Sequence, residues 1–126
     1  MPKREQTASR RVLSVGSDPE LLWLRHAVLQ TSDFQVFTTA DPNEAEWKIR
    51  GSKWDVLLLC YSMNRPERQH LAETFRAYWP GARVVAITNK KIEKPDFADT
   101  FVYGVEGPEA LIEACEKPAG PTSKAC

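Results

Sequence analysis

Asp55-Val56-Leu57-Leu58-Leu59-Cys60 is the most apolar run of the chain and decides its fold. The apolar residues occupy successive positions instead of alternating with polar ones, and turn-forming residues follow them. Continuous apolarity of this length is typical of a central strand in a parallel sheet, which helices cover on both faces. The run therefore predicts an α/β domain built around residues 55–60.

Shorter apolar segments surround this run and alternate with helical patterns. Further strands are predicted over residues 11–16, 34–38, 83–87 and 100–103. Helix starts are indicated by Asp18-Pro19-Glu20, by the capping box Asp41-Pro42-Asn43-Glu44, by Pro66 and by Gly107-Pro108-Glu109. In the capping box, Glu44 is expected to bond the cap amide, and this helix should end near Gly51. Residues 89–99 are expected to hold a further helix, which Pro95 makes short or irregular.

The spacing of large apolar residues predicts which helix faces are buried. Leu21, Leu24 and Val28 follow helical spacing in the first helix, with Leu22 and Leu29 beside them. The third helix carries Leu71, Phe75 and Tyr78 on one face, and Trp47 and Trp54 are expected to be partly exposed.

Five strands that alternate with helices predict a three-layer α/β/α domain with a doubly wound parallel sheet. In such sheets, ligands bind beside the carboxyl ends of the strands. The residues that the sequence places at strand exits are 16–18, 60–62, 88–89 and 103–105.

Length and charge restrict the domain organisation and the class of partner. The 126 residues suit one domain, predicted over 10–116, with a flexible arm at 1–9 and a disordered tail at 117–126. The 17 Lys and Arg residues equal the 17 Asp and Glu residues, which makes nucleic acid and anionic membrane poor partners despite a short basic N-terminus. No run is apolar enough to span a bilayer or to act as a secretory signal, so we expect the cytoplasm. The three Cys residues predict neither a metal site nor a disulfide framework.

Over roughly residues 10–115, the chain resembles the receiver domain of two-component response regulators. Residues 11–15 are similar to the first strand of that family, residues 55–59 to the strand before its phosphoacceptor, and residues 84–88 to its fourth strand with the switch hydroxyl. Pro108-Glu109-Ala110-Leu111 resembles the start of its last helix. The resemblance implies the flavodoxin-like, CheY-like order 2-1-3-4-5 for the five-stranded sheet.

The positions that carry the family's chemistry differ in this chain. The family uses two acidic residues to hold Mg²⁺, an Asp to accept the phosphoryl group, and a hydroxyl and a Lys to contact it. The corresponding residues here are Gly16 and Ser17 for the acidic pair, Cys60 for the phosphoacceptor, Thr88 for the hydroxyl and Gly104 for the Lys. Mg²⁺ prefers hard oxygen ligands, and only the neighbouring Asp18 is acidic. We therefore predict a degenerate receiver that binds no metal or cofactor, is not phosphorylated in the family's manner and is not an enzyme.

Several of these residues also have an ordinary structural interpretation. Asp18 is a suitable helix cap, and the Thr88 hydroxyl can bond nearby backbone. Cys60 is either a small apolar residue that ends a buried strand or a reactive thiol in a redox switch. His26 and His70 lack a partner at ligand spacing, which argues against a catalytic role.

The sequence favours a phosphorylation-independent interaction or regulatory module of a signalling pathway. The resemblance implies a partner surface on the fourth helix, fifth strand and fifth helix, composed of Lys90, Lys91, Phe101, Tyr103, Glu109 and Ile112. Its partner would be a histidine kinase, a response regulator, an effector or a second copy of the chain. The competing hypotheses are a thiol switch at Cys60 and a conventional phosphorelay through a non-standard acceptor.

Overall fold

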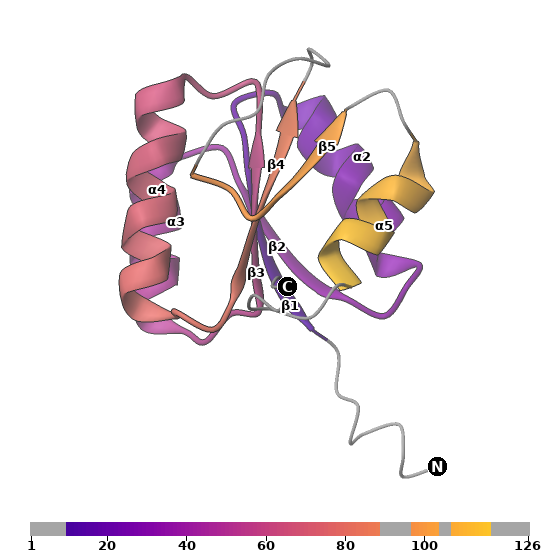
Figure 1. Cartoon of the computed structure of the whole chain (residues 1–126). Coiled ribbons are helices and arrows are strands. Elements are labelled where there is room, and N and C mark those ends of the chain that lie inside the picture. The colour runs from indigo at the N-terminus through magenta and orange to yellow at the C-terminus, as the bar shows by residue number, and fades with distance from the viewer. Residues whose placement is uncertain (1–9, 89–96, 104–106, 117–126) are drawn as a thin grey trace, which may run out of the picture.

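A computed structural model of the chain describes residues 10–88, 97–103 and 107–116 (Figure 1). The predicted arm at 1–9, the tail at 117–126, and Lys90, Lys91 and Gly104 lie outside these ranges. The additional helix expected over 89–99 falls mainly outside them as well. Residues 97–99, which are described, are not helical and lead directly into the last strand.

The described residues form a sheet whose strands all run parallel. The strands are β1 (Arg11–Val15), β2 (Gln35–Thr39), β3 (Val56–Cys60), β4 (Arg83–Thr88) and β5 (Thr100–Tyr103). Their order is β2-β1-β3-β4-β5, which confirms the predicted order 2-1-3-4-5. Every residue of β3 is buried, as expected for a central strand.

Four helices follow the strands in the described part of the chain: α2 (Pro19–Gln30), α3 (Pro42–Gly51), α4 (Arg65–Tyr78) and α5 (Pro108–Glu116). Asp18, Asp41 and Asn64 cap the first three, and each cap is followed by a Pro in the first turn. These starts confirm the sequence signals, because a capping side chain satisfies free helix amides and Pro needs no amide partner there.

The capping box at Asp41 differs from the expectation in one bond. The Glu44 carboxylate does not bond the Asp41 amide directly. Instead it accepts from the Thr39 hydroxyl at 2.5 Å, and that hydroxyl oxygen accepts from the Asp41 amide at 3.1 Å. The hydroxyl of Thr39, at the end of β2, thus lies between the Asp41 amide and the Glu44 carboxylate and bonds both.

Helices cover both faces of the sheet and create two apolar clusters. α3 and α4 lie on one side, and α2 and α5 on the other (Figure 1). Leu57 and Leu59 belong to the cluster beneath α3 and α4, whereas Val56 and Leu58 belong to the cluster beneath α2 and α5. This alternation is the consequence of the two-residue period of a strand, and it confirms the three-layer architecture.

The prediction for the buried face of α2 was wrong for Leu24 and omitted Arg25. Leu22, Arg25 and Leu29 are the buried residues, whereas Leu24 is 55% exposed. Residues 22, 25 and 29 also follow helical spacing. Because Arg25 is charged, the apolar pattern alone does not predict that this stripe is buried.

Two aromatic residues, Trp54 and Tyr78, differ from the expected exposure, whereas Trp47 is exposed as expected. Trp47 is 79% exposed, whereas Trp54 is only 3% exposed and donates from Nε1 to the Lys48 carbonyl at 2.7 Å. In α4, Leu71 and Phe75 are buried as predicted, but Tyr78 is exposed near the helix end. Trp54 precedes β3, where long-range packing rather than the local pattern buries the indole.

Candidate functional site

The parallel register brings the predicted strand exits to one edge of the sheet. Val15 pairs with Leu59, and Cys60 pairs with Ile87, one residue before Thr88. Gly16, Cys60 and Thr88 therefore lie at the ends of three adjacent strands. This confirms that the sequence identified neighbouring positions, although Gly104 lies outside the described residues.

Gly16 occupies the crowded corner between β1 and β3. A Cβ atom added at this position would lie 2.9 Å from the Cys60 Cβ and 3.1 Å from the Ser62 Oγ. The first of these distances is shorter than carbon atoms tolerate, so even an alanine requires a neighbour to move. The site as folded has no room for an acidic side chain at this position.

Ser17 and Ser62 connect the loop after β1 to the loop after β3. The Ser17 amide donates to the Ser62 Oγ at 2.8 Å, and the Ser17 Oγ donates to the Ser62 carbonyl at 2.9 Å. The side chain of Asp18 caps α2 by accepting from the amides of Glu20 and Leu21. The two loops are thus joined by uncharged hydrogen bonds, and the Asp18 carboxylate bonds the amides of the helix that it caps.

Cys60 ends β3 as a buried thiol with a cationic neighbour. Its side chain is 2% exposed, and its Sγ accepts from the Arg25 Nη1 at 2.9 Å and from the Ser62 amide at 3.5 Å. The Arg25 guanidinium also lies over the Tyr61 ring, 5.8 Å from its centroid. A positive charge from α2 therefore stands beside Cys60, the residue that the sequence resemblance aligns with the phosphoacceptor.

Arg25 is the site residue that sequence reasoning missed. The signal that could have revealed it is its position between Leu22 and Leu29 on the buried stripe of α2. An Arg at a core position requires a partner or an opening to solvent. Its neighbour Cys60 lies 35 residues away in the chain, so no local motif connects the two.

Thr88 and four residues of the predicted partner surface belong to the described part of the chain. Thr88 is buried at the end of β4, and its assignment to a backbone bond or a switch stays a prediction. Phe101 and Tyr103 lie on β5, and Glu109 and Ile112 lie on α5. Phe101 and Glu109 are exposed, whereas Tyr103 and Ile112 are half-buried.

The titratable side chains of the described residues do not cluster as metal ligands do. The described ranges contain no group of three or more His, Cys, Asp or Glu residues that could hold a metal ion. His70 Nε2 lies 3.2 Å from the Glu46 Oε1, and Arg50 pairs with the same carboxylate at 2.6 Å. His70 therefore has an acidic neighbour that its sequence context did not reveal, in a surface contact between α3 and α4.

The second described thiol, Cys115 in α5, belongs to the core. It is fully buried in the cluster beneath α2 and α5. Burial, reinforced by the neighbouring Glu116 carboxylate, raises the pKa of Cys115 to about 12. A thiol in this environment stays protonated and unreactive while the domain is folded.

No family model matches the chain, and no curated protein sequence matches it. None of the helices formed by the described residues has the length and apolarity needed to cross a membrane.

Solved structures of receiver domains resemble this chain closely in shape. A CheY-like response regulator receiver domain of Methanospirillum hungatei superposes with a TM-score of 0.74 at 22% identity, over 84% of this chain and 90% of that one. The response regulator TrrA of Thermotoga maritima, in complex with Mg²⁺-BeF, gives a TM-score of 0.72 at 22% identity, over 82% and 94% of the two chains. The receiver domain of a sensor histidine kinase of Pseudomonas aeruginosa, with magnesium in its active-site cleft, gives 0.72 at 15% identity, over 84% and 93%. The chain has the receiver-domain fold of two-component response regulators.

Proposed function

We propose that this protein is a degenerate receiver that regulates a signalling partner by binding it, without accepting a phosphoryl group. The observation that carries the proposal is the contact between the Arg25 guanidinium and the Cys60 Sγ, which occupies the position corresponding to the phosphoacceptor. The receiver-domain fold supports a role in signalling. The side chains at the strand exits argue against phosphoryl transfer to this site.

The electrostatics of the site support this interpretation. Divalent magnesium requires several hard oxygen ligands, and a thiol is a soft ligand that it binds poorly. Gly16 and Ser17 contribute no carboxylate, and the guanidinium of Arg25 repels a second cation. Without a bound dication, the negative charge of an incoming phosphoryl group is not balanced, and transfer is not stabilised.

The proposed binding surface lies on β5 and α5. It comprises Phe101, Tyr103, Glu109 and Ile112, together with Lys90 and Lys91 from the sequence. Exposed and half-buried aromatic residues are frequent anchors in protein interfaces. The proposed partner is a histidine kinase, a response regulator or an effector, and a second copy of the chain is the alternative.

Intact-mass measurement tests the absence of phosphoryl transfer. The protein is incubated with acetyl phosphate and Mg²⁺ beside a receiver domain that is known to be phosphorylated. We expect an adduct only on the control receiver. A phosphoryl adduct on this chain would contradict the proposal and favour a phosphorelay through a non-standard acceptor.

Capture from the native host tests the binding surface. Tyr103→Ala is expected to reduce partner capture, whereas Tyr78→Ala, which removes an exposed tyrosine from α4 on the other side of the sheet, is expected to preserve it. Equal loss in both variants, or in neither, would count against this surface.

A thiol switch at Cys60 is the second candidate function. The Arg25 hydrogen bond favours it, because basic neighbours are typical of reactive thiols, whereas the burial of the sulfur opposes it. The rate of alkylation of native Cys60 against pH, with Cys115 as the buried internal control, separates the candidates. Rapid alkylation of Cys60 in the folded state would favour the switch, and protection of both thiols until unfolding would favour the binding module.

A further inference from the structure

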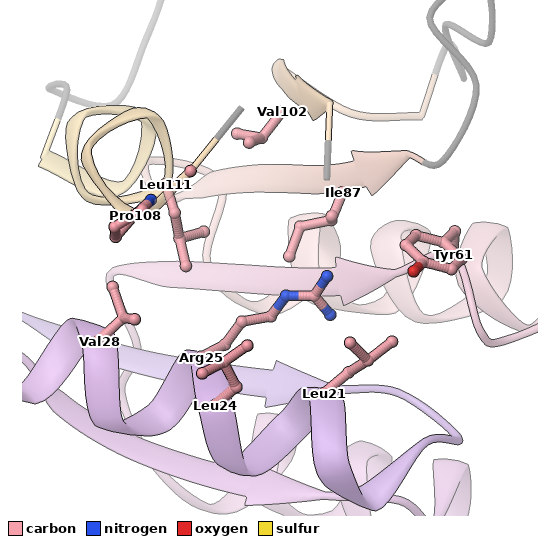
Figure 2. A pocket seen from close by; sticks show the side chains of 10 residues that line it. Leu21, Leu24, Arg25, Val28, Tyr61, Ile87, Val102, Pro108 and Leu111 are labelled. Atoms are coloured by element: carbon pink, nitrogen blue, oxygen red, sulfur yellow. The ribbon is translucent and has the colours of Figure 1, made fainter. Parts of the chain in front are cut away.

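An apolar pocket opens between α2 and α5, on the side of the sheet that holds Arg25 (Figure 2). Its volume is about 310 Å³, which lies at the lower end of the range of small-molecule sites. Aliphatic side chains from both helices and from two strands form most of its wall: Leu21, Leu24, Val28, Ile87, Val102 and Leu111. Tyr61 contributes an aromatic ring, and Pro108 begins the helix on the opposite side.

Arg25 places a positive charge within this apolar wall. In Figure 2 its side chain extends from α2 past Leu21 and ends between Ile87 and Tyr61. Arg25 is 8% exposed, and its interactions with the residues that the structure describes are the hydrogen bond to the Cys60 Sγ and the contact with the Tyr61 ring. No carboxylate of the residues that the structure describes forms an ion pair with it.

Most N–H donors of the Arg25 guanidinium have no hydrogen-bond acceptor among the described residues. A guanidinium carries five N–H donors, and the Cys60 contact uses a single nitrogen of Arg25. Burial of a cation without an anion is unfavourable unless a counter-charge or solvent compensates it. A carboxylate that entered the pocket would form a charge-assisted and often bidentate pair with the guanidinium.

We propose that the pocket between α2 and α5 binds a small molecule that has an apolar body and one carboxylate. The carboxylate pairs with Arg25, and the apolar body packs against Leu21, Val28 and Leu111. This site goes beyond the proposed function, because the pocket wall contains none of Phe101, Tyr103, Glu109 and Ile112. It also lies next to the receiver's acceptor position, since the same guanidinium contacts Cys60.

Calorimetric titration with matched probes tests the required chemistry. Octanoate and 3-phenylpropanoate carry a carboxylate on an aliphatic and an aromatic body. Octanamide has the same chain as octanoate without the charge, and acetate has the charge without the apolar body. At least one of the two acids is expected to bind, with an affinity at least tenfold higher than those of octanamide and acetate.

Two pairs of variants assign the binding to this pocket. Arg25→Met is expected to lower the affinity for the acid at least tenfold, while Arg50→Met, which removes an exposed Arg from α3, preserves it. Leu24→Glu places a competing carboxylate at the exposed rim and is expected to lower the affinity, whereas Leu24→Gln does so much less. The second pair keeps the proposal testable if Arg25→Met fails to fold, because Leu24 is exposed.

Several results would overturn the proposal. These are the absence of binding by both acids at millimolar concentration, equal affinities for octanoate and octanamide, and unchanged affinity in Arg25→Met or Leu24→Glu. Sedimentation that shows a dimer in the absence of acid, dissociated by Leu24→Glu, would assign the groove to a second copy instead. Glu106 precedes the pocket residue Gly107 in sequence, and acid binding that appears only in Glu106→Gln would identify the chain's own carboxylate as the occupant.

Discussion

The guanidinium of Arg25 in α2 donates a hydrogen bond to the thiol sulfur of Cys60 at the end of β3, over 2.9 Å. This bond connects the core side of a helix to the residue that the sequence resemblance aligns with the phosphoacceptor. It places a positive charge beside that residue. The bond also links the candidate acid pocket to the strand exits, because Arg25 belongs to both.

An acidic residue at position 60 is expected to pair with Arg25 rather than restore a metal site. Cys60→Asp should be about 1–3 kcal/mol more stable than Cys60→Asn at neutral pH, the range for hydrogen bonds that involve charged groups. Urea unfolding measures this difference, which should disappear when both variants also carry Arg25→Met. Stabilisation of Cys60→Asp by Mg²⁺, without a similar effect on Cys60→Asn, would contradict the expectation.

That pairing has a defined pH dependence. The adjacent guanidinium is expected to lower the pKa of the new carboxyl group below its unfolded value. The stability advantage of Cys60→Asp over Cys60→Asn is therefore present above the unfolded pKa and is lost as pH falls through the folded pKa. An advantage that grew on acidification would show that the carboxyl group is neutral beside Arg25.

Gly16→Ala is expected to destabilise the domain by about 1–3 kcal/mol, which is typical of overpacking in a close-packed region. The added methyl group meets the Cβ of Cys60 at 2.9 Å and the Oγ of Ser62 at 3.1 Å. Gly51→Ala is the matched control, because a Cβ there meets no atom within 4 Å and Ala favours the helix. Unfolding in urea should therefore show a loss for Gly16→Ala and no loss for Gly51→Ala, and similar values for the two would refute the crowding argument.

Ser62→Ala is expected to loosen the loop after β1, because it removes the acceptor of the Ser17 amide. The free energy of unfolding should fall by roughly 0.5–1 kcal/mol, as for a typical hydrogen bond that is exposed to water. Hydrogen exchange of the Ser17 amide should become faster. Ser52→Ala, in the residue that follows α3, serves as the control and should leave that exchange rate unchanged.

Cys115 is expected to make the domain less stable at alkaline pH. Its pKa is about 12 in the folded protein against an ordinary value of 9.0, with burial as the main cause. The unfolded chain loses this proton above pH 9 while the folded chain keeps it, so the stabilisation is complete below pH 9 and is lost as pH rises toward 12. Between these values, the unfolding equilibrium constant should rise by up to tenfold per pH unit from this group.

Comparison with Cys115→Ala isolates the effect of this thiol from that of other alkaline titrations. The variant is expected to be less stable at neutral pH, since it leaves a small cavity in the core. Its stability should nevertheless decline less steeply above pH 9. Parallel pH profiles for the two proteins, measured by urea unfolding under reducing conditions, would contradict a raised pKa for Cys115.

The layers and the order of the helices and strands could be predicted from local sequence signals. The unbroken apolar run at 55–60 requires cover on both faces, and Asp18-Pro19 and Asp41-Pro42 fix helix starts through bonds within a single turn. These signals are local, because strand and helix periods and cap chemistry involve residues a few positions apart. The resemblance supplied the strand order, which the sheet confirms.

The side-chain contacts at the ends of the strands depend on residues that are far apart in the sequence and meet only in the folded domain. Residues 35 positions apart form the Arg25–Cys60 bond, and residues 45 positions apart form the Ser17–Ser62 bonds. The burial of Trp54, the crowding at Gly16 and the pocket beside Arg25 likewise arise from elements that meet only in the folded domain. The helix and strand periods predict which face of an element a side chain occupies. Which atoms that side chain contacts depends on how the helices pack against the sheet.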